Sequence, residues 1–144
     1  MPEGVTAARL DQAPEQRFAR LRAGLGISSF GINVIVLEPG QRNRIHRHRQ
    51  QEEVYVVLDG TLTLIVEGEP QQHVAGDVVR VAPQVRRQLV NRGAADLRLL
   101  ALGGYVEHEH EPRDAEAFDA WDDVEPGTPQ TVPLPEDLSA SELA

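Results

Sequence analysis

Two histidines separated by one residue, His46 and His48, constrain the fold more than any other part of the chain. In an extended segment alternate side chains point to the same face, so the two imidazoles project together. Glu53 follows, at the start of a run over residues 54–58 that is rich in the residues typical of a strand. These three side chains, the ligand set, can converge on one point. Two imidazoles and a carboxylate suit a divalent transition metal with positions left open for water or substrate.

The spacing around these residues resembles the first motif of the cupin superfamily, which reads Gly, five residues, His-x-His, three or four residues, Glu, six residues, Gly. Gly40 opens the motif here and Gly60 closes it, and the count back from Gly60 selects Glu53 as the carboxylate. In that family these residues are metal ligands inside a small antiparallel β-barrel. The resemblance implies a divalent transition metal, Fe, Mn, Zn or Ni, held by His46, His48 and Glu53.

The same family carries a second motif, roughly Gly-Asp, a short strand, Pro-x-Gly, two residues, His, three residues, Asn. Its histidine is the fourth metal ligand. The run from Gly76 to Asn91 preserves the separation of fifteen residues between the Gly and the Asn, but Pro83 comes one place late and its glycine is absent. Arg87 occupies the histidine position. A guanidinium keeps its proton in a protein and cannot coordinate a metal.

Arg87 leaves two interpretations open. In the first, the ligand set holds a metal by itself, which is chemically complete for non-haem iron, and Arg87 clamps an anionic substrate. In the second, the metal is absent and Arg87 forms an ion pair with Glu53. Arg44 shares the strand phase of the histidines and Tyr55 shares that of Glu53. Both are therefore further candidates for contacting the substrate.

Strand-forming runs recur along the chain with turn residues between them, which favours an antiparallel sandwich or barrel independently of the resemblance. Asp59-Gly60 separates two apolar runs and predicts a β-hairpin between them. The predicted strands cover residues 29–37, 54–58, 62–66, 71–74, 78–81, 85–90 and 97–102.

Helices are predicted at both ends. Phe18, Leu21 and Leu25 recur at helical spacing and predict a short helix over residues 15–25. A second helix is predicted over residues 112–123, packed on the barrel through its apolar side. From residue 125 onward, prolines at positions 126, 129, 133 and 135 favour an extended tail that wraps the domain.

The predicted fold class is all-β: a single antiparallel, jelly-roll-like β-barrel of the cupin type, with a short N-terminal helix and an irregular acidic C-terminal tail. The chain divides into a flexible arm at residues 1–14, the barrel domain with its leading helix at 15–106, and an acidic helix and tail at 107–144. The edge strands of such a barrel and the family resemblance imply a homodimer.

Charge and composition exclude several classes of function. The formal net charge of −9 lies in the C-terminal part, since residues 107–144 carry one arginine against 12 acidic residues, whereas residues 1–106 carry 13 against 11. This argues against nucleic-acid binding. The chain has no lysine for Schiff-base chemistry and no cysteine for disulfides or thiolate zinc sites. A cytoplasmic protein without membrane contact is predicted, because no apolar stretch is long enough to cross a bilayer.

Two functions are compatible with these features. The leading one is a metal-dependent cupin that binds a small anionic metabolite in the barrel and oxidises or isomerises it. The alternative is a non-catalytic, metal-free cupin that acts as a small-molecule-binding or structural domain. His73 is a weaker candidate for the missing ligand, and the cluster at residues 108–111 is interpreted as a solvated loop. The sequence assigns no catalytic residue.

Overall fold

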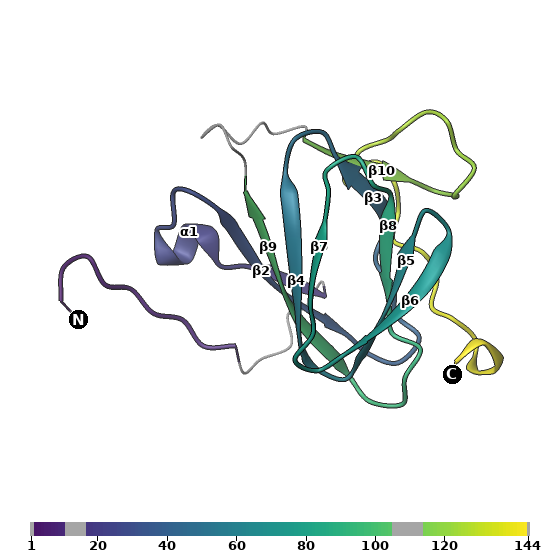
Figure 1. Cartoon of the computed structure of the whole chain (residues 1–144), viewed down its shortest axis with the longest axis horizontal. Helices are drawn as coiled ribbons and strands as arrows, with labels where there is room; N and C mark the ends of the chain where they lie inside the picture. Colours follow the sequence, from purple (N-terminus) through teal and green to yellow (C-terminus); the bar gives the residue numbers. More distant parts are fainter. Residues whose placement is uncertain (1, 11–16, 105–113, 144) are drawn as a thin grey trace.

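Ten strands in the described part of the chain, residues 2–10, 17–104 and 114–143, form two antiparallel sheets that pack face to face (Figure 1). In this computed structural model, the elements are β1 Phe18–Arg20, α1 Arg22–Leu25, β2 Gly31–Leu37, β3 Ile45–His48, β4 Glu52–Asp59, β5 Thr61–Val66, β6 Glu69–Val74, β7 Val78–Val81, β8 Arg87–Val90, β9 Leu97–Gly104, β10 Ala115–Phe118 and the 3-10 helix η1 Ala140–Glu142. One sheet has the order β1-β2-β9-β4-β7 and the other β10-β3-β8-β5-β6. The predicted all-β fold is confirmed.

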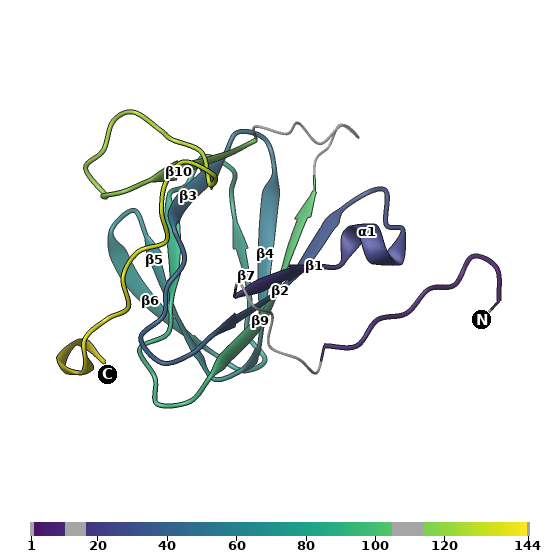
Figure 2. The same cartoon turned by 180° about the vertical axis from the view of Figure 1, so that it is seen from behind.

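The C-terminal tail, residues 125–143 in the described part, lies along the domain as predicted (Figure 2). The backbone N–H of Leu138 donates to the carbonyl of Gly40 at 2.8 Å. Arg42 Nε donates to the carbonyl of Glu136 at 3.0 Å. Prolines prevent the tail from pairing as a regular strand, so backbone and side-chain groups of the domain supply isolated partners to its backbone.

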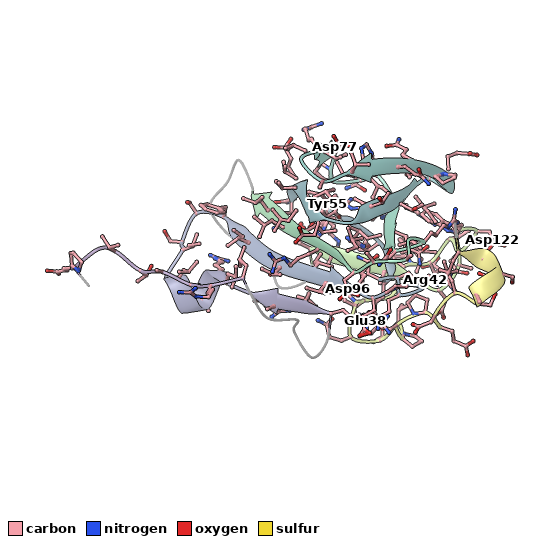
Figure 3. All side chains as sticks on the ribbon, turned by 90° about the horizontal axis from the view of Figure 1, so that it is seen from below. Glu38, Arg42, Tyr55, Asp77, Asp96 and Asp122 are labelled. Atoms are coloured by element: carbon pink, nitrogen blue, oxygen red, sulfur yellow. The ribbon has the colours of Figure 1, made fainter. Side chains whose placement is uncertain are left out.

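The core lies between the sheets and follows the two-residue period of the strands. In β9 every second residue is buried, beginning with Leu97. Tyr55 of β4 is almost fully buried, and Figure 3 shows it among the strands, whereas Asp77 and Asp122 lie at the periphery. Leu62 and Leu64 of β5 contribute from the opposite sheet. The residues between the buried positions of β9, among them Arg98, Leu100 and Leu102, face away from the core and are partly exposed.

The hairpin predicted around Asp59-Gly60 is wrong, because the two strands it joins belong to different sheets. β4 pairs with β7 and β9, whereas β5 pairs with β6 and β8. The register of β4 against β9 shifts between Val57 and Asp59, and such an irregularity bends a strand away from its partner. Gly60 has φ +81°, and a Cβ there would lie 2.5 Å from the carbonyl oxygen of Asp96. The dipeptide therefore forms a corner between sheets.

The N-terminal helix is present but shorter than predicted. α1 covers Arg22–Leu25, whereas Phe18–Arg20, which fall inside the predicted range 15–25, form β1 and pair with β2. Pairing prevails over helical spacing because the edge of β2 offers unpaired backbone groups. Neither this helix nor any other in the described residues is long and apolar enough to span a membrane.

A strand also replaces the helix predicted over residues 112–123. Ala115–Phe118 form β10, which pairs with β3 so that Ala117 lies opposite His46. Phe118 is buried, as the apolar pattern indicated, and Ala117 is buried with it, whereas Ala115, which the pattern also placed against the barrel, is only partly buried. Over so few residues a helical stripe and a strand are hard to distinguish, and the free edge of β3 supplies the partner that decides for a strand.

Candidate metal centre

The ligand set is brought together from both sheets. His46 and His48 alternate on β3, and Glu53 reaches them from β4 of the facing sheet. His46 Nε2 lies 3.4 Å and His48 Nε2 lies 3.1 Å from the same oxygen, Glu53 Oε1. One donor atom from each residue lies within 4.8 Å of the others. The convergence predicted from the alternation of β3 is therefore present.

Both imidazoles are oriented through Nδ1. His46 Nδ1 lies 3.0 Å from the carbonyl oxygen of Arg44, and His48 Nδ1 lies 2.9 Å from Asp114 Oδ2. Each of these partners can only accept, so each Nδ1 carries a proton and donates it. Nε2 of each ring then faces Glu53, where it either donates a proton to the carboxylate or offers its lone pair to a metal. A metal-ligating histidine is commonly held in this way by an acceptor on its other nitrogen.

Asp114 is a site residue that the sequence did not reveal. It directly precedes β10 and is buried, and its carboxylate accepts the backbone N–H of Gln50 at 2.8 Å and of Gln51 at 3.3 Å in addition to His48 Nδ1. In the sequence it is one acidic residue among twelve in the C-terminal part. Only the pairing of β10 with β3 would have indicated its position, and that pairing was mistaken for a helix.

Glu53 also has an arginine and a tyrosine as partners. Arg87 Nη2 donates to Glu53 Oε1 at 2.6 Å, and the Tyr55 hydroxyl donates to the same oxygen at 2.8 Å. Arg87 Nε lies 3.4 Å from the Tyr55 oxygen, and Nη1 donates to the carbonyl of Val85 at 2.7 Å. The ion pair of the second interpretation is therefore present. Arg87 is fully buried and its donors serve the protein, so its predicted role as a substrate clamp is not supported by this position.

Burial and the neighbouring charges shift several pKa values in this cluster. Burial raises the pKa of Glu53, but its contacts with His46 and His48 outweigh burial and hold that pKa well below the usual value. Burial lowers the pKa of His46, which favours the neutral ring. Burial and the charge of Glu53 raise the pKa of Tyr55 well above its usual value. Burial opposes the charge of Arg87, but Tyr55 and Glu53 outweigh it, so that pKa is raised.

The donor set fits a divalent metal. Two neutral imidazoles that point their Nε2 lone pairs at one carboxylate oxygen repel it unless a proton or a metal cation lies between them. Two nitrogen donors and one oxygen donor suit Fe, Mn, Zn or Ni. His46, His48 and Glu53 are the residues that would hold the ion.

Comparison with known proteins identifies the domain. Residues 33–103 match a family described as the cupin domain. The chain carries a cupin domain. A cupin protein from Bacteroides fragilis has a similar structure, with a TM-score of 0.66 and 21% identity over 76% of this chain and 92% of its own. A structure described as a sugar phosphate isomerase from a cupin superfamily, from Silicibacter pomeroyi, gives a TM-score of 0.62 and 30% identity over 72% of this chain and 65% of its own.

Among curated proteins, an uncharacterized protein of Methanocaldococcus jannaschii is 25% identical over 76 residues, which make up 53% of this chain and 60% of that protein. The chain thus spans less than two thirds of this curated relative and of the Silicibacter pomeroyi structure. The family match and the Bacteroides fragilis structure together support the cupin fold.

A cavity of about 440 Å³ opens beside the ligand set of the cupin domain. The ligand set lies on its wall together with the polar residues Arg17, Asn43 and Arg44. The remaining wall is apolar and consists of Phe18, Ile35, Leu37, Pro129 and Leu134. Phe18 comes from β1, with Arg17 directly before it, Ile35 and Leu37 come from β2, and Pro129 and Leu134 come from the C-terminal tail. Part of this wall therefore lies outside the matched range 33–103.

Of the residues predicted to contact a substrate, only Arg44 lines this cavity. Its Nε donates to the carbonyl of Val132 in the tail. Burial and the nearby charge of Arg17 lower its pKa. Tyr55 and Arg87 lie behind Glu53 and support that carboxylate.

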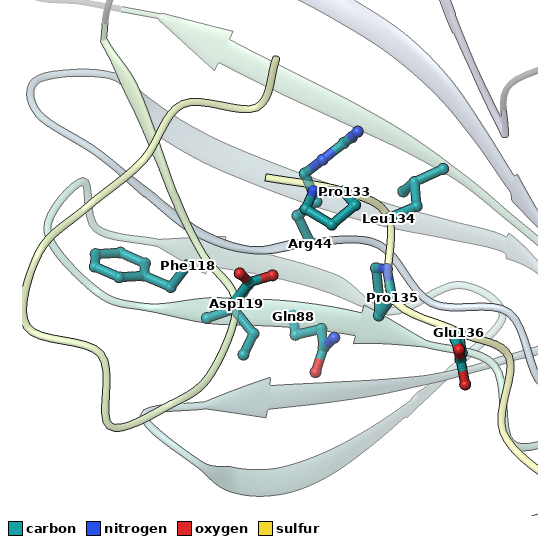
Figure 4. Close-up of a pocket in the computed structure, with 9 residues that line it drawn as sticks. Arg44, Gln88, Phe118, Asp119, Pro133, Leu134, Pro135 and Glu136 are labelled. Atoms are coloured by element: carbon teal, nitrogen blue, oxygen red, sulfur yellow. The ribbon is translucent and has the colours of Figure 1, made fainter. Parts of the chain in front are cut away.

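A smaller cavity of about 220 Å³ lies on the other side of Arg44 and Leu134, which line both cavities. Figure 4 shows its labelled wall, which includes Gln88 of β8, Phe118 of β10 and the tail residue Pro135. Gln88 Nε2 donates to the carbonyl of Asn43 at 2.9 Å. Arg44 and Leu134 thus lie between the two cavities.

The weaker candidates lie elsewhere. His73 is on β6, where its Nε2 lies 3.1 Å from Gln71 Oε1, and it is not part of the ligand set found among the described residues. The cluster at residues 108–111 lies outside the described residues.

Proposed function

We propose that the cupin domain binds a divalent transition metal through His46, His48 and Glu53 and a small anionic molecule beside it. The observation that carries the proposal is the common orientation of the two imidazoles. Each ring donates a hydrogen bond from Nδ1 to an acceptor, and each directs Nε2 at Glu53 Oε1. In a metal site, each ligating histidine is expected to donate its other ring N–H to an acceptor that fixes the orientation of the ring.

The charges around the ligand set favour an anionic ligand. Glu53 and Arg87 form a neutral pair, and imidazoles that ligate a metal add no charge. A divalent ion in the same place leaves two positive charges, of which Asp114 offsets one through His48. Arg44 adds a further cation to the cavity wall. A buried excess of positive charge is unfavourable by itself, so an anion stabilises the loaded site.

The reaction we propose is isomerisation or oxidation of that anionic metabolite. Support for isomerisation comes from the Silicibacter pomeroyi structure described as a sugar phosphate isomerase. A bound metal supplies Lewis-acid polarisation of a substrate oxygen. The contribution of this chain is to orient the two rings, to hold Glu53 ionised through Arg87 and Tyr55, and to hold the anion near Arg44.

A second candidate function is metal-free binding of a small molecule, favoured by the ion pair between Arg87 Nη2 and Glu53 Oε1 at 2.6 Å. Glu53 already has a cationic partner, so the pocket is electrically satisfied without a metal. In this case His46 and His48 offer hydrogen bonds to the ligand.

Elemental analysis of protein prepared without an affinity tag and without added metal distinguishes the two functions. The metal-binding function predicts close to one equivalent of metal per chain. It also predicts a melting temperature that rises by about 5 °C or more when Zn²⁺, Mn²⁺ or Fe²⁺ replaces chelator. His46→Ala should abolish this rise, and His73→Ala is the matched control, since His73 lies outside the ligand set. A wild-type melting temperature that is the same in chelator and in all three metals contradicts the proposal.

We also propose that the protein is a cytoplasmic homodimer. Support for the dimer comes from the exposed hydrophobic side chains Val74 and Val78, on the edge strands β6 and β7. Such edges are sites where strands of a second chain can pair or pack. Sedimentation at micromolar concentration tests the dimer, and a single monomeric species contradicts it.

A further inference from the structure

The cavity beside the ligand set has a wall that is polar in one part and apolar in the rest, and this composition indicates the class of ligand. Beyond the ligand set, its hydrogen-bonding side chains are Arg17, Asn43 and Arg44, and its other members are apolar. Asn43 Oδ1 already accepts the backbone N–H of Leu89 at 2.7 Å. Few partners are therefore left for a ligand with many hydroxyl groups. Hydroxyls placed against the apolar wall would lose their hydrogen bonds to water without replacement.

Arg44 is the cation best placed to receive an anion. Arg17 is engaged, since its Nη2 lies 3.3 Å from Asp137 Oδ1 and its Nη1 donates to the carbonyl of Arg42. Arg44 uses Nε for the carbonyl of Val132, and no described carboxylate lies within ion-pair distance of its guanidinium. Its two Nη groups are therefore positioned to bind a carboxylate or a phosphate.

The apolar wall extends from the interior to the rim. Leu37 is fully buried, Ile35 is partly buried, and Phe18 and Leu134 are more than one third exposed, at 40% and 38%. An apolar ligand body that covers Phe18, Ile35 and Leu134 removes their exposed surface from water, which is favourable.

We infer that the ligand of this cavity is an acid with an apolar body: an anionic head, carboxylate or phosphate, binds at Arg44, and a hydrocarbon portion packs on Phe18, Ile35, Leu37 and Leu134. The inference rests on the proposed function for the nature of the site and departs from the polyhydroxylated substrate that a sugar phosphate isomerase takes. The cavity volume of about 440 Å³ accommodates a small acid of this kind.

Calorimetric titration of the Zn²⁺-loaded protein with four probes tests the inference. Hexanoate and hexyl phosphate carry both features, 1-hexanol lacks the charge, and ribose 5-phosphate lacks the apolar body. At least one of the two hexyl anions should bind tenfold or more tightly than both 1-hexanol and ribose 5-phosphate. Equal or tighter binding of ribose 5-phosphate, equal binding of 1-hexanol, or no binding of either hexyl anion overturns the inference.

Three variants test which residues bind the anionic head of the ligand and which contact its hydrocarbon portion. Arg44→Gln should weaken the hexyl anions tenfold or more and leave 1-hexanol unchanged. Leu134→Ser should weaken the hexyl probes and leave ribose 5-phosphate unchanged, and it remains informative if Arg44→Gln fails to fold. Arg49→Gln is the matched control, because Arg49 is an exposed arginine that does not line the cavity. An equal loss in Arg49→Gln and Arg44→Gln contradicts the role of Arg44.

Repetition of the titration in chelator separates this inference from the proposed function. A preference for hexyl anions that persists without metal supports the ligand class and removes the need for a metal. Metal binding that depends on His46, without a preference for hexyl anions, leaves the proposed function intact and overturns the ligand class.

Discussion

Arg87 lies with its Nη2 2.6 Å from Glu53 Oε1, and it holds this position without any exposure to solvent. Its Nη1 is held by the carbonyls of Pro83 and Val85, at 3.1 and 2.7 Å. The guanidinium is thus a fixed counter-ion for one of the three candidate metal ligands. A fixed cation at this position limits the affinity for a metal and at the same time keeps the carboxylate ionised.

Replacement of Arg87 should therefore affect stability and metal affinity in opposite directions. Removing one partner of a buried ion pair costs about 3 to 5 kcal/mol, so Arg87→His should melt at a lower temperature than the wild type in chelator. With Zn²⁺ present, the imidazole removes a positive charge and offers a fourth donor, so metal affinity should rise tenfold or more. Thermal melts of both proteins in chelator and in Zn²⁺ measure the two effects. An Arg87→His variant as stable as the wild type in chelator contradicts the role of the ion pair.

Asp114→Asn should weaken metal binding without unfolding the domain. An amide has one acceptor oxygen, whereas the Asp114 carboxylate receives His48 Nδ1 and the N–H groups of Gln50 and Gln51. If the amide NH₂ faces His48, Nδ1 must accept its hydrogen bond. The proton of the imidazole then lies on Nε2, and that nitrogen can no longer bind a metal. Loss of such an orienting partner lowers metal affinity about 10- to 100-fold.

A competitive titration with a fluorescent zinc chelator measures this affinity. Asp122→Asn is the control, because Asp122 is an exposed carboxylate of the same C-terminal part. Equal zinc affinities for wild type, Asp114→Asn and Asp122→Asn would exclude Asp114 as a positioning residue.

Gly60→Ala should be more destabilising than Gly68→Ala. Both glycines have φ above +80°, where a side chain costs about 1 to 2 kcal/mol. At Gly60 the new Cβ also lies 2.5 Å from the carbonyl oxygen of Asp96, whereas at Gly68 nothing lies within 4 Å. Urea denaturation of the two variants measures the difference. Equal losses in the free energy of unfolding would contradict the prediction, because they would mean that the backbone around Asp96 moves away from the new Cβ without a measurable loss of stability.

Acid should reduce the stability of the metal-free protein partly through Glu53. Its folded-state pKa lies well below the usual 4.5, so its contribution is fully present above pH 4.5 and is lost as the pH falls through the folded-state pKa. Glu53→Gln lacks this titration. The gap in unfolding free energy between wild type and variant should therefore narrow below pH 4.5, by at most about 1.4 kcal/mol per pH unit. Urea denaturation in chelator between pH 3 and 7 measures the gap, and a constant gap contradicts the prediction.

The sequence predicted what depends on local spacing. The alternation around His46 and His48 was enough to predict that both face one side, and the glycine spacings carried the family resemblance that implied the ligand set and the cupin fold. What was missed depends on which strand edges are free in the folded chain. Asp59-Gly60 has the chemistry of a hairpin turn, but β5 finds its partners in the other sheet. Asp114 becomes a site residue only because β10 pairs with β3.

The location of Leu134 has a consequence for how proteins of this type diversify. The ligand set lies inside the matched range 33–103, whereas Phe18, Asp114 and Leu134 lie outside it. Phe18 and Leu134 can therefore change in sequence without replacing a candidate ligand, whereas Asp114 is tied to His48. Ligand preference can then evolve at Phe18 and Leu134 while the ligand set and Asp114 are kept, and exchange of the segment around Leu134 between homologues becomes a route to new specificity.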